Sequence, residues 1–109
     1  MQRERDKAFR APVIVVVAAR LQHAHKIPVI EQIASAAAAA QTIMLAAPAL
    51  GFGAVWKTGA PAYDPQIKTT LGLAADDEIV GFLYLGQRAG GSSPIRRPDP
   101  KDFVTTWNG

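Results

Sequence analysis

The stretch from Gln32 to Val55 carries no charged side chain and is the feature that most constrains the fold of this 109-residue chain. Ala, Ile, Leu and Met fill most of its first part, a composition that favours a buried helix. Gly51 then offers a left-handed stop for that helix, and residues 54–56 predict a short strand. Lys57 and Thr58 follow at once. A helix that leads through a glycine turn into a strand, with a cation and a hydroxyl at its end, is typical of a helix-packed ligand site.

The predicted helix begins near Pro28, because proline and an acidic residue such as Glu31 are favoured in a first helical turn. Glu31, Ser35 and Thr42 share one side of this helix, while nearly every other position is apolar. We therefore expect the helix to be buried almost all round. A sheet would cover one side, and a second helix, such as the same helix of another subunit, would cover the other. Pro48 removes one backbone hydrogen bond and should tighten the last turn.

Two continuous apolar runs, Val13–Ala19 and Ile79–Gly86, show no alternation of polar and apolar residues. Such runs predict central strands of a sheet that are buried on both faces. Between them, the Asp-Pro pair at 64–65 is a typical cap and first residue of a helix, which would end at Gly72. The acidic run Asp76–Glu78 is expected to be a solvated turn before the second strand.

The C-terminal part of the chain differs in composition from the rest. Residues 88–101 are rich in Gly, Ser, Pro and Arg, which is typical of an extended arm. Residues Phe103–Trp107 then predict a terminal strand without a local partner, which indicates pairing with another subunit. We find no internal repeat, so we expect one domain over residues 1–109, with residues 88–109 as its C-terminal arm.

Composition limits the classes to which the chain can belong. Apolar residues make up 49% of the sequence and charged residues 19%, which indicates a globular protein with an obligate interface. The absence of cysteine excludes disulfides, thiolate metal sites and a cysteine nucleophile, and the cytoplasm is the expected compartment. Residues Met1–Lys7 alternate in charge and lack the apolar core of a signal peptide.

Neither a membrane nor a nucleic acid is an expected partner. The uncharged stretch is long enough to span a bilayer, but alanine is only weakly apolar, and Ser, Gln, Thr, Pro and Gly interrupt the segment. The net charge of +3 is spread along the chain, and Glu4 and Asp6 separate the basic residues of the N-terminus. A nucleic-acid interface would need a less interrupted basic stripe.

The sequence displays no catalytic or metal-binding set of its own. His23 and His25 would share one face of an extended segment, but only Glu31 lies nearby as a third ligand. No serine lies in a nucleophile elbow, and no pair of carboxylates flanks an apolar pocket. If the chain is an enzyme, a cofactor supplies the reactivity. Gly51–Gly53 is not a dinucleotide fingerprint, because it follows a helix and enters a strand.

Several segments nevertheless form a familiar set: Arg10–Pro12 before the first strand, His25–Pro28 leading to Glu31 and Gln32, the alanine-rich helix, Gly51–Gly59, and Ile79–Gly86. Together they resemble the C-terminal half of the FMN-dependent nitroreductase family, in particular its small NAD(P)H nitroreductases. The resemblance extends from Ala8 to Val104. It implies an α+β, nitroreductase-like fold with a mixed central sheet flanked by helices, here lacking the N-terminal part.

The resemblance also implies a function and an assembly. Family members move a hydride from NAD(P)H to the N5 atom of FMN and then pass electrons to a nitro compound, a quinone or a similar acceptor, in a ping-pong reaction. FMN lies at the interface of a homodimer, and the C-terminal arm reaches over the partner. The expected partners are thus a second subunit and a small-molecule electron acceptor.

By position, the resemblance implies two sets of site residues. The family's FMN-contacting segment is matched by Trp56, Lys57, Thr58 and Gly59, and its NAD(P)H segment by Ala46, Ala47, Pro48, Ala49, Leu50 and Gly51. Lys57 and Thr58 are the chemical candidates, because a cation and a donor near the flavin ring would favour its reduction. Trp56 could equally pack in the core. Arg96 and Arg97 could bind the FMN phosphate as bidentate donors, or belong to a solvated arm.

One part of the family pattern is missing from this chain. Family members carry an N-terminal half with an Arg-Arg-Ser-type segment that grips the FMN phosphate, so we expect only half of the FMN site to be encoded here. Two interpretations follow. The chain is an FMN-dependent oxidoreductase whose missing half is supplied or compensated, or it is a non-catalytic dimerisation scaffold without flavin.

Overall fold

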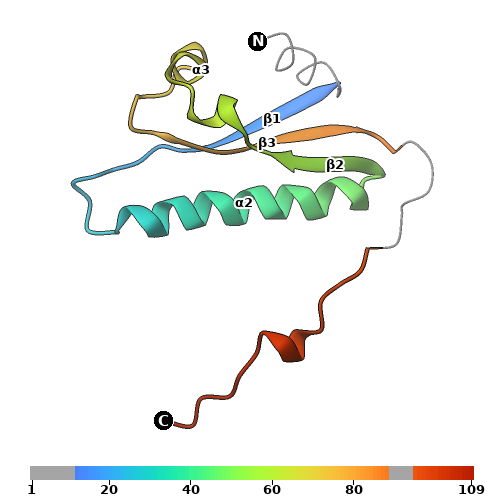
Figure 1. Ribbon diagram of the computed structural model, residues 1–109. Coiled ribbons are helices and arrows are strands. Elements are labelled where there is room, and N and C mark those ends of the chain that lie inside the picture. Colours follow the sequence, from blue (N-terminus) through green and yellow to red (C-terminus); the bar gives the residue numbers. More distant parts are fainter. Residues whose placement is uncertain (1–11, 89–94) are drawn as a thin grey trace.

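A computed structural model describes residues 12–88 and 95–109 of the chain. Figure 1 shows a small sheet with a long helix along one face and a short helix above the other. This arrangement confirms the predicted α+β class. The elements, in chain order, are β1 (Val13–Ala19), α2 (Val29–Ala49), β2 (Phe52–Lys57), the 3-10 turn η1 (Ala60–Tyr63), α3 (Pro65–Thr70), β3 (Glu78–Gln87) and the 3-10 turn η2 (Pro100–Asp102).

The sheet has three antiparallel strands in the order β1-β3-β2, so the described residues contain no parallel pair of the mixed sheet that the resemblance implied. The prediction that residues 79–86 form a central strand is confirmed by β3, which pairs with a neighbour on each side. The prediction of a central position for β1 is wrong within the described part of the chain, where β1 pairs only with β3. The predicted burial of this strand on both faces is also incomplete, because only Ala19 is buried and Val13 is 52% exposed.

The two faces of the sheet carry different side chains because successive residues of a strand point to opposite sides. Trp56 of β2 lies opposite Leu83 of β3, and Leu83 is fully buried beneath α2. Ala40 and Ala47 are the buried residues of α2. Small side chains at these two positions let the helix backbone approach the sheet closely, so the core of the described chain lies between α2 and β3.

Both ends of α2 agree with the sequence-based prediction. The helix follows Pro28, carries Glu31 in its first turn and is followed by Gly51, whose φ of 90° is the left-handed conformation expected of a helix stop. Pro48 lies inside the last turn. The N–H of Leu50 donates to the carbonyl oxygens of both Ala46 and Ala47, each at 3.1 Å. The turn is tightened as expected.

The prediction that this helix is buried almost all round is wrong for the single chain. Only two of its residues are buried, and Ile30 and Leu45 are 74% and 67% exposed. Within residues 12–88 and 95–109, the side of α2 that faces away from the sheet has no segment packed against it (Figure 1). By length and composition α2 is also able to cross a membrane, and only 6% of its most apolar stretch is buried. The core helix of a soluble protein or a signal sequence can have the same length and composition.

The second predicted helix is confirmed by α3. The Oδ1 atom of Asp64 accepts a hydrogen bond of 2.9 Å from the N–H of Gln66, and Pro65 is the first residue of the helix. Gly72, with a φ of 76°, follows the helix as expected. The prediction of a solvated turn at residues 76–78 is wrong for Asp77, which is 2% exposed. Its carboxylate accepts hydrogen bonds from two backbone N–H groups, which offsets the cost of its burial.

Residues 95–109 form an exposed segment that leads away from the sheet and α2 (Figure 1). The predicted strand at Phe103–Trp107 is not formed in this part of the structure, because no strand edge lies beside it to pair with its backbone. The predicted arm over residues 88–101 lies partly outside the described residues. The N-terminal segment Met1–Lys7 and Arg10 lie wholly outside them.

Candidate functional site

An open cavity of about 680 Å³ lies on the face of the sheet opposite α2. Its floor is the sheet itself, its wall is the connection that follows β2, and its rim is α3 with the residue after it. The side chains are mostly apolar. The cavity is lined by Ile14, Val16, Phe82 and Tyr84 from the sheet, by Lys57, Thr58, Gly59, Ala60 and Pro61 from the wall, and by Ile67, Thr70 and Leu71 from the rim.

The register of the strands explains why these sheet residues share one face. Ile14 pairs with Tyr84, Val16 pairs with Phe82, and Lys57 also lies opposite Phe82. Paired residues of antiparallel strands point to the same side. The cavity floor therefore has two aromatic residues at its centre, with aliphatic residues of β1 on one side and Lys57 of β2 on the other.

The wall of the cavity depends on a turn that only glycine adopts readily. Gly59 has a φ of 79°, a conformation that strains any residue with a Cβ atom. The chain then enters η1, where Ala62 is fully buried and its N–H donates to the Gly59 carbonyl oxygen at 3.1 Å. This turn carries the chain from the end of β2 around to the cap of α3, and so encloses one side of the cavity.

Lys57 supplies the positive charge of the cavity. Its Nζ atom lies 5.3 Å from the centroid of the Tyr84 ring, and both side chains are half-buried. In the part of the chain that the structure describes, no carboxylate forms an ion pair with this lysine. The cavity thus holds a cation whose partner is an aromatic face.

Backbone and hydroxyl groups of the wall complete the polar set. Among the described residues, the N–H groups of Gly59 and Ala60 donate no hydrogen bond, and neither does the Thr58 hydroxyl. The Thr70 hydroxyl, by contrast, donates to the Gln66 carbonyl oxygen at 2.9 Å. The wall therefore offers several donors that a bound ligand can use, above an apolar and aromatic floor.

The structure separates Trp56 from the residues that follow it. Trp56 points to the face of the sheet that α2 covers, whereas Lys57 points into the cavity. The Nε1 atom of Trp56 donates to the Val80 carbonyl oxygen at 3.2 Å, and the side chain is half-buried. This is the packing role that the sequence left open beside FMN contact.

The residues matched to the NAD(P)H segment, 46–51, lie at the other end of β2 from Lys57. They form the last turn of α2 and the turn before Phe52. Five steps along a strand span roughly 17 Å, and α2 lies on the face opposite the cavity (Figure 1). One copy of the chain does not bring residues 46–51 and Lys57 together.

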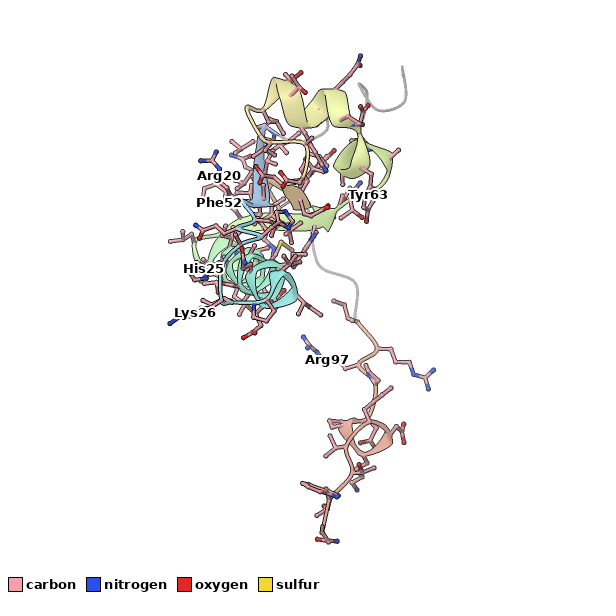
Figure 2. All side chains as sticks on the ribbon, turned by 90° about the vertical axis from the view of Figure 1, so that its left-hand side faces the viewer. Arg20, His25, Lys26, Phe52, Tyr63 and Arg97 are labelled. Atoms are coloured by element: carbon pink, nitrogen blue, oxygen red, sulfur yellow. The ribbon has the colours of Figure 1, made fainter. Side chains whose placement is uncertain are left out.

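Arg96 and Arg97 belong to the exposed C-terminal segment and do not line the cavity. Figure 2 shows Arg97 on the segment that leaves the body of the protein, whereas Tyr63 lies beside α3. Among the cavity residues Lys57 is the one cation, so the described cavity has no cluster of basic residues that would grip a phosphate.

The two histidines have separate partners. His23 Nε2 lies 2.9 Å from Asp76 Oδ2, and His25 Nδ1 accepts a hydrogen bond of 3.2 Å from the Ile27 N–H. No group of three potential metal ligands occurs within the described ranges. Both side chains are exposed in the loop between β1 and α2, and His25 is labelled in Figure 2.

Sequence reasoning missed two aromatic residues of the cavity, Phe82 and Tyr84. They lie in a run that was assigned as a buried strand, where nothing marks one face as different from the other. The available signal was the spacing of two between them, combined with an antiparallel pairing to the strand that ends at Lys57. That pairing depends on a register that the sequence alone does not fix.

Comparison with known proteins decides the family. A family model described as "Nitroreductase family" matches residues 1–87. The chain belongs to the nitroreductase family. It is 42% identical over 106 residues to "Putative NAD(P)H nitroreductase YdjA" of Escherichia coli (strain K12), covering 96% of this chain and 58% of that protein. It is 30% identical over 109 residues to "Putative NAD(P)H nitroreductase" of Haemophilus influenzae, with the same coverage.

The fold agrees with that of a solved member of the family. The crystal structure of a nitroreductase-like family protein from Bacillus cereus superimposes with a TM-score of 0.83 at 26% sequence identity, over 99% of this chain and 57% of that chain. The nitroreductase-like fold is thereby confirmed. The chain spans 58% of the length of the curated nitroreductases that it matches.

Proposed function

We propose that this nitroreductase-family protein is an FMN-dependent oxidoreductase that uses NAD(P)H to reduce nitro compounds, quinones or similar acceptors. The observation that carries the proposal is the cavity opposite α2, where Lys57 and the free donors of residues 58–60 stand beside an aromatic floor. The names of the relatives support it. We also propose a cytoplasmic location, the compartment expected of a chain without cysteine.

The residues of the cavity fit the ring system of a flavin. Phe82 and Tyr84 form a flat apolar floor, and a volume of about 680 Å³ is within the range of sites that hold cofactors. The N–H groups of Gly59 and Ala60 are free to donate to ring carbonyl oxygens. Because the turn at Gly59 fixes these donors, they would need little rearrangement when a ligand binds.

FMN, when bound, would accept a hydride from NAD(P)H and pass electrons to the acceptor. The chain's own contribution would be to bind and orient the ring and to stabilise the negative charge that develops on it. The Lys57 ammonium and the Thr58 hydroxyl are the groups of the cavity able to do so. Charges and donors that are already in place stabilise such charge without further rearrangement.

The phosphate of FMN requires residues outside the cavity. Lys57 is the one cation among the lining residues, and a single cation used at the ring would leave the phosphate without a partner. We propose Arg96 and Arg97 for this role, in the same copy or in a second one, because a guanidinium pairs with phosphate oxygens in a bidentate way.

The NAD(P)H segment and the FMN segment do not meet within one copy of the chain. Residues 46–51 are remote from Lys57 in one copy, as described above. A homodimer that packs α2 of each copy against the other would cover the exposed apolar side chains of that helix, such as Ile30 and Leu45, but it would leave residues 46–51 on the face of the sheet opposite the cavity. We propose this homodimer as the functional unit.

The exposed side of α2 also favours the second candidate function. A chain that uses this face to associate, without binding flavin, would act as a dimerisation scaffold. The two functions differ in whether the cavity has a measurable affinity for flavin, which is the quantity to determine first.

The experiment is a titration of the purified chain with FMN, followed by quenching of flavin fluorescence, with riboflavin titrated in parallel. We expect saturable quenching, and a loss of about tenfold in affinity for Lys57→Ala, the magnitude of one charged hydrogen bond. Lys26→Ala, which removes an exposed lysine outside the cavity, is the matched control. Absence of binding to the unaltered chain would overturn the proposal for these 109 residues: the N-terminal half of the family pattern would then be required for flavin binding, and the chain by itself would be a scaffold.

Riboflavin tests the role of the two arginines, because it lacks the phosphate. If Arg96 and Arg97 bind the phosphate, the unaltered chain prefers FMN to riboflavin, and the double variant Arg96→Ala, Arg97→Ala loses that preference. An unchanged preference in the double variant would assign both arginines to a solvated arm.

A further inference from the structure

The contact between Lys57 and Tyr84 assigns a role to a residue that does not itself need to touch the cofactor. The Nζ atom of Lys57 lies over the Tyr84 ring, 5.3 Å from its centroid, and both side chains line the cavity. This distance is within the range of a cation–π interaction. A lysine side chain that otherwise has four rotatable bonds is thereby held near one place.

The sheet register makes this contact possible. Lys57 is directly opposite Phe82, and Tyr84 is two residues further along β3 on the same face. Diagonal neighbours in an antiparallel pair lie within reach of long and aromatic side chains. Tyr84 is itself fixed between Ile14 of β1 and Val55 of β2, because β3 is the central strand. The ring therefore projects from a strand that is paired on both of its edges, beside a long and flexible lysine side chain.

An aromatic ring and a carboxylate have different effects on the charge and the N–H donors of a neighbouring ammonium group. A carboxylate beside Lys57 would hold the ammonium but would also cancel its charge, and the described residues place none there. A ring is uncharged, so the ammonium keeps its full charge and its remaining N–H donors for a ligand in the cavity. The arrangement orients the cation without neutralising it.

We infer that Tyr84 is a positioning residue, which holds the Lys57 ammonium at the wall of the cavity so that it meets the electron-rich edge of a bound flavin ring. The inference rests on the proposed function, since it concerns the same site. It accounts for an aromatic residue at position 84, where an aliphatic one would fill the floor of the cavity equally well.

The first test needs no flavin. In the NMR spectrum of the protein without cofactor, the ε-methylene protons of Lys57 should be shifted upfield by the ring current of Tyr84. Tyr84→Phe keeps the ring and should retain this shift, whereas Tyr84→Leu should abolish it. Tyr63→Leu, at an exposed tyrosine outside the cavity, is the matched control and should leave the shift in place.

The second test measures FMN affinity and the midpoint potential of the bound FMN. We expect Tyr84→Leu to weaken FMN binding about fivefold, the size of a cation–π contact, and to make the potential more negative. Tyr84→Phe should change neither. In a Lys57→Ala background, Tyr84→Leu should have no further effect on the potential, because a positioning residue acts through the group that it positions.

The outcomes separate the inference from the proposed function. Failure of the unaltered chain to bind FMN overturns the proposed function, while the ring-current shift still decides whether Tyr84 holds Lys57. The inference is overturned if the ring-current shift is absent. It is also overturned if Tyr84→Leu changes the midpoint potential as much in the Lys57→Ala background as in the unaltered protein. Circular dichroism of Tyr84→Leu checks the fold; if that variant does not fold, the presence or absence of the ring-current shift in the unaltered chain still decides whether Tyr84 holds Lys57.

Discussion

The indole of Trp56 lies against the backbone of Gly81, so that a Cβ atom at position 81 would lie 2.6 Å from the Trp56 Cδ1 atom and would overlap the indole nitrogen. Gly81 is buried in the central strand β3, and Trp56 belongs to the neighbouring strand β2. Glycine weakens a strand interior unless something approaches closely. Here the approach of the indole explains why position 81 carries no side chain.

Gly81→Ala should therefore destabilise the protein by about 1–3 kcal/mol, the usual cost of overpacking a filled site. The measurement is the free energy of unfolding in urea. Gly53→Ala is the matched control, because a Cβ there would meet Arg88 Cγ at an ordinary 3.5 Å, and its effect should be much smaller. Equal losses for both variants would contradict the packing of Trp56 on Gly81.

Replacing Trp56 tests whether it packs in the core or contacts the cofactor. Trp56→Phe keeps an aromatic ring but loses the hydrogen bond of 3.2 Å to the Val80 carbonyl oxygen. We expect a loss of about 1 kcal/mol in the free energy of unfolding, with FMN affinity unchanged. A large fall in FMN affinity without a loss of stability would instead place Trp56 at the flavin.

Asp77 ties two loops together and should be sensitive to substitution. Its side chain is 2% exposed and accepts from the Ala74 N–H at 2.9 Å and from the Leu21 N–H at 3.2 Å. Asp77→Ala would leave both donors unpaired, at a cost of about 1–3 kcal/mol. Thermal unfolding measures this loss. Asp76→Ala, which removes an exposed contact of 2.9 Å with His23, should cost at most about 1 kcal/mol.

The acidic run Asp76–Glu78 shows a kind of contact that local sequence patterns do not predict. Capping, proline and glycine signals are local, so Asp64, Pro65 and Gly51 predicted the helix boundaries correctly. The role of Asp77 depends on Leu21, which is 56 residues away in the chain, and no local pattern marks such a pair. A run of three acidic residues gives the same signal whether one member is buried or all are solvated.

The sequence likewise did not predict whether a strand lies at the centre or at the edge of the sheet. The run Val13–Ala19 predicted a strand correctly, but a continuous apolar run reports cover on both faces and says nothing about neighbours at the edges. Phe103–Trp107 has the composition of a strand but forms none in the single chain, where no strand lies beside it, and its pairing with another subunit stays a prediction. In the site, Lys57 was predicted because it matches the family's FMN-contacting segment. The place of Tyr84 in the cavity depends on the register between β2 and β3, which the sequence does not show.

The exposed side of α2 gives a test of the proposed homodimer. Leu45 is 67% exposed in the single chain, so Leu45→Glu should leave the fold intact. In a dimer packed through α2, the same change would bury a charge in an apolar interface and weaken association at least about tenfold. Light scattering coupled to size-exclusion chromatography over a concentration series measures the dissociation constant.

Two comparisons make the Leu45 experiment decisive. Gln66→Glu adds a negative charge at an exposed position of α3, on the other side of the sheet, and should leave association unchanged. Ala40→Leu enlarges a fully buried residue of α2 and should lower stability instead, because it separates the helix from the sheet. A Leu45→Glu variant that associates as strongly as the unaltered chain would show that α2 is not the interface.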